Sequence, residues 1–215
     1  MRNMLRKEFK LAMHPIAIIF LSFSAMLLIP NYPYYVAFFY LGLAVFFTCL
    51  NGRENYDILY SISLPVRKKD IVKARFLFVI ILQLSQIALA IPFAILRQNL
   101  PVPCNQVGME ANIAFFGLSF VLFGIFNLVF FRIYYKDVNK VGKAFLISSI
   151  VVFLYIMVVE SCTHILFFAK NYLDTKDTYY LKEKLIVLVV GMLIYSITTL
   201  IAYRKSVKDF EALDL

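Results

Sequence analysis

The sequence predicts an all-α integral membrane protein, and three observations support this. Of its 215 residues, 62% are hydrophobic and only 16% are charged, whereas a soluble domain is about half apolar and about a quarter charged. The apolar residues form long runs separated by short polar segments. The lysines and arginines cluster beside alternate runs, as in a protein that crosses a bilayer several times. The net charge of +9 therefore indicates a membrane surface and not nucleic acid.

Six apolar segments are predicted to cross the membrane within a single domain, 1–215. A helix needs about 20 apolar residues to cross about 30 Å of hydrocarbon. The first segment is short and is bracketed by Pro15 and Pro30. Pro15 suits the first turn of a helix, where its missing N–H costs nothing. The predicted spans are residues 15–29, 34–50, 76–96, 111–131, 144–169 and 185–203.

Residues 1–13 are predicted to form an amphipathic helix that lies in the membrane interface. Its apolar stripe faces away from four cations, as in helices that rest on anionic headgroups. The residue before a proline is biased away from the helical conformation, so we expect a bend at His14. The alternative is that 1–13 extend the first span, which would carry the cations into lipid.

The distribution of cations predicts the orientation. Of the 22 lysines and arginines, 17 lie in the N-terminal segment, the second and fourth loops and the tail. Only five lie in the third and fifth loops, and the first loop has none. Because loops rich in Lys and Arg stay on the cytoplasmic side, both termini are predicted to be cytoplasmic, with an even number of spans.

The second loop, 51–75, is predicted to be partly helical. It carries seven Tyr, Ile, Leu or Val side chains between positions 56 and 66, which is too apolar for a flexible linker. Pro65 disfavours a helical conformation at the residue before it. We therefore expect a short helix over about 54–63, a break, and a second helix from about Lys68. From the residues alone, docking on a partner protein and binding to lipid headgroups are both open.

The string "SISLPVRKKDIVKARF" at 61–76, preceded by Glu54 and Leu59, resembles the first cytoplasmic loop of the permeases of type-two-class ABC exporters. A weaker similarity lies at 133–145, where this family has a second cytoplasmic contact. The chain departs from the family at Arg67, where many relatives have a helix-capping Ser or Thr. The matching positions are Ser63, Leu64, Pro65, Val66, Lys68, Ile71, Val72, Ala74 and Arg75.

The resemblance implies that the helix before Pro65 is a coupling helix, which fits a cleft on a cytoplasmic ATPase. The chain has no G-x-x-x-x-G-K-[ST] string to cradle phosphate, so we expect no enzyme activity and no cofactor on it. ATP and Mg²⁺ would bind the partner. The implied assembly is two permease copies, identical or paired, with two ATPase subunits in a bacterial cell membrane. The expected ATPase contacts are Glu54, Asp57, Leu59, Tyr60, Ser61, Leu64 and Pro65, and the expected headgroup anchors are Arg67, Lys68 and Lys69.

Polar side chains within the spans are candidates for a translocation pathway or a gate. They are Gln83, Gln86, Asn127, Glu160 and His164. Glu160 is an acid well inside an apolar run, and its i, i+4 spacing from His164 allows an ion pair. The alternative is that these groups only bond neighbouring helices. No metal site is predicted, because the chain has two distant histidines and no C-x-x-C.

Whether Cys104 and Cys162 form a disulfide is left open, since both are predicted to lie on the external side.

The leading hypothesis is therefore the permease of an ATP-driven exporter of an amphipathic or antimicrobial peptide. Lipid or drug efflux is equally compatible with 22 phenylalanines and no large external domain. A non-transporting membrane scaffold or immunity protein is the alternative. A membrane protease is disfavoured, because the sequence has neither H-E-x-x-H nor paired membrane acids.

Overall fold

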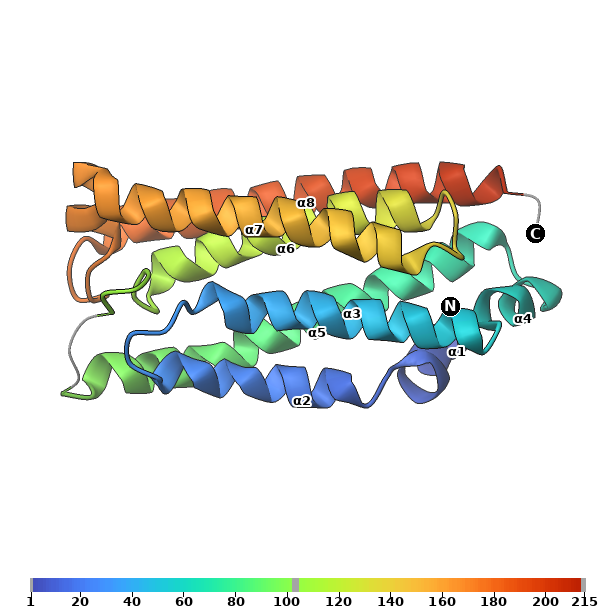
Figure 1. The fold of residues 1–215 in the computed structure, drawn as a ribbon, viewed down its shortest axis with the longest axis horizontal. Helices are drawn as coiled ribbons and strands as arrows, with labels where there is room; N and C mark the ends of the chain where they lie inside the picture. Colours follow the sequence, from blue (N-terminus) through green and yellow to red (C-terminus); the bar gives the residue numbers. More distant parts are fainter. Residues whose placement is uncertain (1, 102–104, 214–215) are drawn as a thin grey trace.

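The computed structural model describes residues 2–101 and 105–213 as helices packed along one long axis (Figure 1). Within these ranges the chain forms no strand. Five of the helices are long and apolar enough to cross a membrane. They are α3 (Tyr35–Glu54), α5 (Lys68–Asn99), α6 (Ile113–Tyr134), α7 (Val141–Ile165) and α8 (Leu181–Glu211). The predicted all-α membrane fold is confirmed.

The first predicted span is built from two short pieces. Seven residues form α2 (Ile16–Ser22), and six more continue it as the 3₁₀ helix η2 (Phe23–Leu28). Because a 3₁₀ helix rises ~2.0 Å per residue against ~1.5 Å in an α-helix, the pair extends ~22 Å. Together with the helical segment before it, the pair counts as a sixth candidate span.

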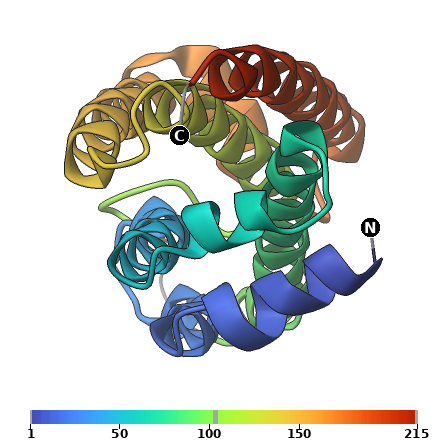
Figure 2. The same cartoon turned by 90° about the vertical axis from the view of Figure 1, so that its right-hand side faces the viewer.

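The segment before α2 lies almost at a right angle to it. It consists of α1 (Arg2–Lys7) and the wider π-type turn η1 (Glu8–Ala12), and the bend between the two pairs is 89°. The backbone becomes extended at Met13, just before the His14–Pro15 pair. Figure 2 shows α1 lying across one end of the bundle, the end where Figure 1 also places α4 and both termini. This geometry suits a helix that rests in the membrane interface.

The connection between α3 and α5 folds as the short helix α4 (Asp57–Ser63). Tyr56, which precedes it, has a φ of 53°, and this left-handed conformation turns the chain sharply at the end of α3. Such a conformation costs a non-glycine residue about 1–2 kcal/mol. Leu64 is extended, as expected before Pro65, and α5 begins at Lys68. The short helix starts later than 54 because α3 itself continues to Glu54.

The last two spans differ from their predicted limits. α7 ends at Ile165 and the chain then forms a separate turn, η3 (Ala169–Leu173). α8 continues past residue 203 to Glu211. The extension is stabilised by Phe210, which is fully buried with its ring 5.3 Å from that of Tyr135. Hydropathy could not reveal this extension, because the added turns contain several charged residues.

The α6–α8 pair is held at very short range by two glycines. A Cβ at Gly191 of α8 would overlap the carbonyl group of Gly117 on α6. A Cβ at Gly117 would in turn lie 2.6 Å from the carbonyl oxygen of Val187. The two helices therefore pack backbone against backbone, as small residues allow in membrane bundles. At its start, α6 is capped by Asn112, which accepts a 3.0 Å hydrogen bond from the backbone N–H of Phe115.

The outer faces of α7 and α8 are covered with exposed apolar side chains. They include Leu146, Ile150, Phe153, Leu154, Met157, Ile186, Leu193 and Ile197. Soluble proteins rarely expose continuous apolar surfaces of this kind. Lipid is the medium that suits them.

We predict that Gly191→Leu destabilises the protein by about 1–3 kcal/mol or more, because the new side chain must separate α6 from α8. The measurement is unfolding of the detergent-solubilised protein in increasing dodecyl sulfate, followed by far-ultraviolet circular dichroism. Gly142→Leu is the matched control, since a Cβ at Gly142 meets no atom within 4 Å. Equal unfolding midpoints for the two variants would contradict the close α6–α8 contact.

Candidate functional site

A network of buried charges lies where α1, η1, α4 and α5 meet. Arg75 of α5 is 4% exposed and points between two carboxylates. Its Nε lies 2.6 Å from Glu8 Oε2 on η1, and its Nη2 lies 2.6 Å from Asp57 Oδ2 on α4. Lys7 completes the network, with its Nζ 2.6 Å from Asp57 Oδ1 and 3.3 Å from Glu8 Oε1. We call Lys7, Glu8, Asp57 and Arg75 the ionic clasp.

The ionic clasp balances its own charge, with two cations against two carboxylates. Such balance is required where groups are buried, because an unpaired buried charge is very costly. Ser61 of α4 joins it by accepting a 2.8 Å hydrogen bond from Lys7, while donating to the Asp57 carbonyl at 2.7 Å. Three segments that are separate in sequence are thereby fastened together at one end of the bundle.

Other side chains of α4 and its flanks are exposed. Tyr56, Leu59 and Tyr60 are 69%, 49% and 58% exposed, and Glu54 at the end of α3 is also exposed. A hollow of about 200 Å³ is lined by Tyr60 together with Lys7 and Asp57, so Tyr60 lies beside the ionic clasp. A second, smaller hollow of about 80 Å³ includes Leu59. α4 is thus a short ridge with an aromatic and aliphatic crest.

The expected ATPase contacts therefore divide into two groups. Glu54, Leu59, Tyr60 and Pro65 are exposed and Leu64 is partly exposed. Asp57 and Ser61 instead point inward to the ionic clasp. Their contact with another protein stays a prediction, and in this structure they bond within the chain.

The turn between α6 and α7 lies next to α4. Arg53 at the end of α3 donates a 3.3 Å hydrogen bond from Nη1 to the carbonyl of Asn139 in this turn. Lys140 donates to Asp137 at 2.8 Å, and this bond lowers the pKa of the Asp137 carboxyl. The segment 133–145, singled out in the sequence, thus reaches the same end of the molecule as α4.

The three expected headgroup anchors have different surroundings. Arg67 pairs with Asp70 at 2.9 Å while its side chain stays largely exposed. Lys68 donates to the carbonyl of Leu213 at 2.5 Å and lies 5.9 Å above the ring of Phe210. Lys69 is exposed. Lys68 therefore holds the end of α8, a role that the sequence did not suggest, whereas the anchor role of exposed Lys69 stays a prediction.

Two of the candidate pathway residues meet in the middle of the bundle. Gln83 of α5 and Asn127 of α6 exchange hydrogen bonds of 2.8 and 3.0 Å. Asn127 also donates to Thr199, and Tyr195 donates to Gln83, both from α8. These four groups satisfy one another and join three helices, which is the structural role that buried amides commonly have in membranes.

Gln86 is separate from that cluster. It is fully buried, and its backbone carbonyl accepts a 3.5 Å hydrogen bond from Ser24 of η2. Its side-chain amide has no hydrogen-bond partner in the part of the chain that the structure describes. The structure therefore does not bring Gln86 together with Gln83 and Asn127.

Glu160 lies at the opposite end of the bundle from the ionic clasp. Its Oε2 accepts a 2.9 Å hydrogen bond from the backbone N–H of Met109, in the segment before α6. Asp174 accepts a 2.8 Å bond from the N–H of Glu110 in the same segment, and burial raises the pKa of the Asp174 carboxyl. His164 is exposed, and among the described residues it forms no ion pair with Glu160. Glu160 thus attaches the segment before α6 to α7.

No group of three metal-ligating side chains occurs within residues 2–101 and 105–213. Cys104 falls outside the described residues, so the question of its pairing with Cys162 stays open.

Sequence reasoning missed the ionic clasp, although one signal was present. Glu8 lies four residues after Met4 and four before Ala12, which places an acid on the apolar stripe of the N-terminal helix. Such an acid needs a buried cation as partner. The sequence marks Arg75 only as one of the cations on the predicted cytoplasmic side and as a position of the family string. Nothing in the sequence alone pairs it with position 8.

We predict that Arg75→Met lowers the free energy of unfolding by about 3–5 kcal/mol, because it leaves two carboxylates facing a single lysine. Arg132→Met is the matched control, since Arg132 is an exposed cation near the same end of the bundle. Dodecyl sulfate unfolding measured by circular dichroism compares the two. A control that loses as much stability as Arg75→Met would argue against a buried charge network.

Comparison with known proteins now adds to this geometry. The family described as "ABC-2 family transporter protein" has a model that matches residues 3–210. No curated protein and no solved structure matches the chain. The family match covers every helix described above almost completely, from α1 to α8. It agrees with the family resemblance of the loop that holds α4. The chain belongs to the ABC-2 transporter family of membrane proteins.

Proposed function

We propose that this chain is the membrane permease of an ATP-driven exporter, and that α4 is its contact with a separate cytoplasmic ATPase. Membership of the ABC-2 family supports the permease role. The observation that carries the assignment of α4 is that it combines exposed side chains with a charged link to the bundle. Tyr56, Leu59 and Tyr60 are exposed, whereas Asp57 fastens the same short helix to a membrane-spanning helix.

The crest of α4 suits a protein cleft better than water. Aromatic side chains are enriched in the anchors of protein interfaces, where they fill pockets on the partner. In this proposal Leu59 and Tyr60 enter a cleft of the ATPase, Glu54 pairs with a cation at its rim, and Leu64 and Pro65 close the end of the contact. Asp57 and Ser61 are assigned to transmission, because their side chains face the ionic clasp.

The ionic clasp is the proposed route from the ATPase to the spans. A displacement of α4 moves Asp57, and Asp57 is bonded to Arg75 of α5 and Lys7 at the end of α1. Both links are short and charged, so α4 cannot slide away from α5 without exposing or unpairing charges. α5 also packs along α8 and η2. Movement of the ridge would therefore reach several spans together.

The proposed assembly contains two permease copies and two ATPases in a bacterial cell membrane. ATP and Mg²⁺ bind the ATPases. The predominance of cations near α4 supports a cytoplasmic position for this end, where both termini also lie. The proposed substrate is an amphipathic or antimicrobial peptide, which suits the aromatic-rich interior and short outer segments. Lipid or drug efflux is the alternative that a transport assay would reveal.

We predict that the double variant Leu59→Asp and Tyr60→Asp loses its ATPase. The tagged chain is purified from its own cells, and the co-purifying protein with a phosphate-binding G-x-x-x-x-G-K-[ST] string is quantified together with ATP hydrolysis. Two buried carboxylates in the contact should reduce binding at least tenfold. Ala212→Asp, at an exposed position of the same end, is the control. Recovery of the ATPase in equal amount with the double variant would refute the assignment of α4.

We also predict that Asp57→Asn separates binding from coupling. The crest of α4 is unchanged, so the ATPase should remain bound, whereas ATP-driven transport in vesicles should fall about 2- to 30-fold, the range of a 0.5–2 kcal/mol coupling. Glu54→Gln at the exposed edge is the comparison, and it should affect binding before coupling. Unchanged transport by Asp57→Asn would remove the ionic clasp from the pathway.

A further inference from the structure

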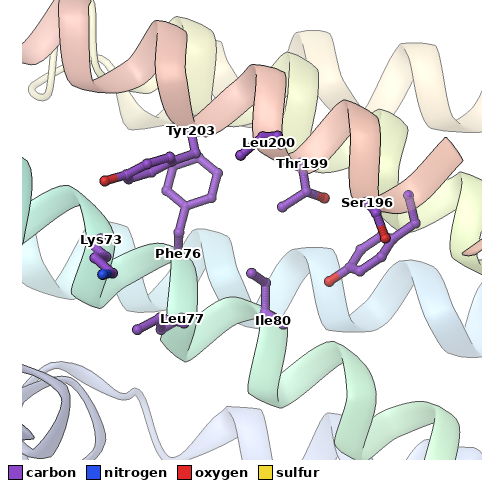
Figure 3. Close-up of a pocket in the computed structure, with 9 residues that line it drawn as sticks. Lys73, Phe76, Leu77, Ile80, Ser196, Thr199, Leu200 and Tyr203 are labelled. Atoms are coloured by element: carbon purple, nitrogen blue, oxygen red, sulfur yellow. The ribbon is translucent and has the colours of Figure 1, made fainter. Parts of the chain in front are cut away.

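A groove lies between α5 and α8, close to the end of the bundle that carries α4. Its volume is about 360 Å³, which falls within the range of about 300–1,000 Å³ typical of small-ligand sites. Figure 3 shows Lys73 and Tyr203 at one end and Ser196 at the other. The groove is lined by Lys73, Phe76, Leu77 and Ile80 of α5 and by Tyr195, Ser196, Thr199, Leu200 and Tyr203 of α8.

The dimensions of the groove match one leaflet of a bilayer. From Lys73 to Ile80 the axis of α5 rises ~10 Å, and from Tyr203 to Tyr195 the axis of α8 covers ~12 Å. Half of the hydrocarbon thickness is ~15 Å. The groove is thus long enough for most of an extended acyl chain of one leaflet.

The walls of the groove suit a hydrocarbon ligand. The hydroxyl of Tyr195 donates to Gln83, and that of Thr199 accepts from Asn127. Ser196 donates to the backbone carbonyl one helical turn earlier. Because these hydroxyls already bond within the chain, a polar ligand would gain little from them. What faces the groove is largely the apolar surface of aromatic, leucine and isoleucine side chains.

The mouth of the groove is positively charged. Lys73 is exposed and forms no ion pair within 4 Å in the described part of the chain. Lys69 precedes it by one helical turn and is also exposed. Asp70 and Glu211 are the acids near this end of the groove, and the Asp70 carboxylate is bound by Arg67 at 2.9 Å. The mouth therefore offers an ammonium group to an anion at the depth of the lipid headgroups.

We propose that this groove binds an anionic phospholipid of the leaflet beside α4. One acyl chain lies along Phe76, Leu77 and Ile80, and the phosphate contacts Lys73. A lysine near an anionic surface contributes about 1 kcal/mol, which is about a fivefold preference over a zwitterionic lipid. The inference rests on the proposed orientation in the membrane but not on the proposed ATPase.

The absence of tryptophan from the sequence makes a direct test available. Leu200→Trp places a single fluorophore in the wall of the groove, and Phe153→Trp on the exposed face of α7 is the control. Each protein is reconstituted in phosphatidylcholine vesicles that contain a small, varied fraction of dibrominated phosphatidylglycerol or dibrominated phosphatidylcholine. Bromine quenches only a tryptophan that it touches.

We expect half-maximal quenching of Trp at position 200 at about a fivefold lower fraction of brominated phosphatidylglycerol than of brominated phosphatidylcholine. At position 153 the two lipids should quench equally. Adding Lys73→Gln to the Leu200→Trp protein should remove the preference. Tyr203→Trp is a second reporter, chosen because it exchanges one aromatic ring for another, and it should show the same preference.

Three results would overturn the proposal. Equal quenching by the two lipids at positions 200 and 203 would mean that the groove has no headgroup preference. Protection from both lipids would mean that another protein segment fills it. A preference that survives Lys73→Gln would place the anion elsewhere. Because no ATPase takes part in this assay, its outcome is independent of the proposed transport role.

Discussion

The organisation of this protein depends on the requirement that four charges at one end of a membrane bundle neutralise one another, of which Glu8 and Arg75 are buried and Lys7 and Asp57 are partly buried. Arg75 cannot be buried without Glu8 and Asp57, and these two carboxylates bring with them the N-terminal helix and the loop helix. α4 has only seven residues, too few for a helix to be stable on its own in water. Its position must therefore come from tertiary bonds. The ionic clasp supplies them and leaves Leu59 and Tyr60 exposed.

The α4 end and the middle of the bundle are built on different physical principles. At the α4 end, ion pairs join segments that are distant in sequence, and such pairs have few alternative partners. In the middle, Gln83, Asn127, Tyr195 and Thr199 join three helices through neutral hydrogen bonds. α6 and α8 add a contact of backbone against backbone at Gly117 and Gly191. A displaced α4 would thus act on a core whose helices move together rather than one by one.

Hydropathy and prolines were enough to predict the membrane fold and the approximate helices of this chain. The break at Pro65 and a helix starting near Lys68 follow from local backbone restrictions, so a single sequence contains them. The partners of charged residues are not local. Periodicity places Glu8 on the apolar face of its helix, but it does not say which of 22 cations meets it. For the same reason the sequence predicts Asp57 as an ATPase contact but does not reveal its bond to Arg75.

The shortness of α2 and η2 has a consequence for the lipid around them. A rod of ~22 Å falls ~8 Å short of an ordinary hydrocarbon core, and each ångström of mismatch costs a fraction of a kcal/mol. The bilayer at this edge must thin, or a neighbouring copy must shield the deficit. Thinned lipid presents a lower barrier to an amphiphile than the surrounding membrane does. Among the candidate spans, α2 with η2 is thus the one whose helical length falls furthest below the hydrocarbon thickness.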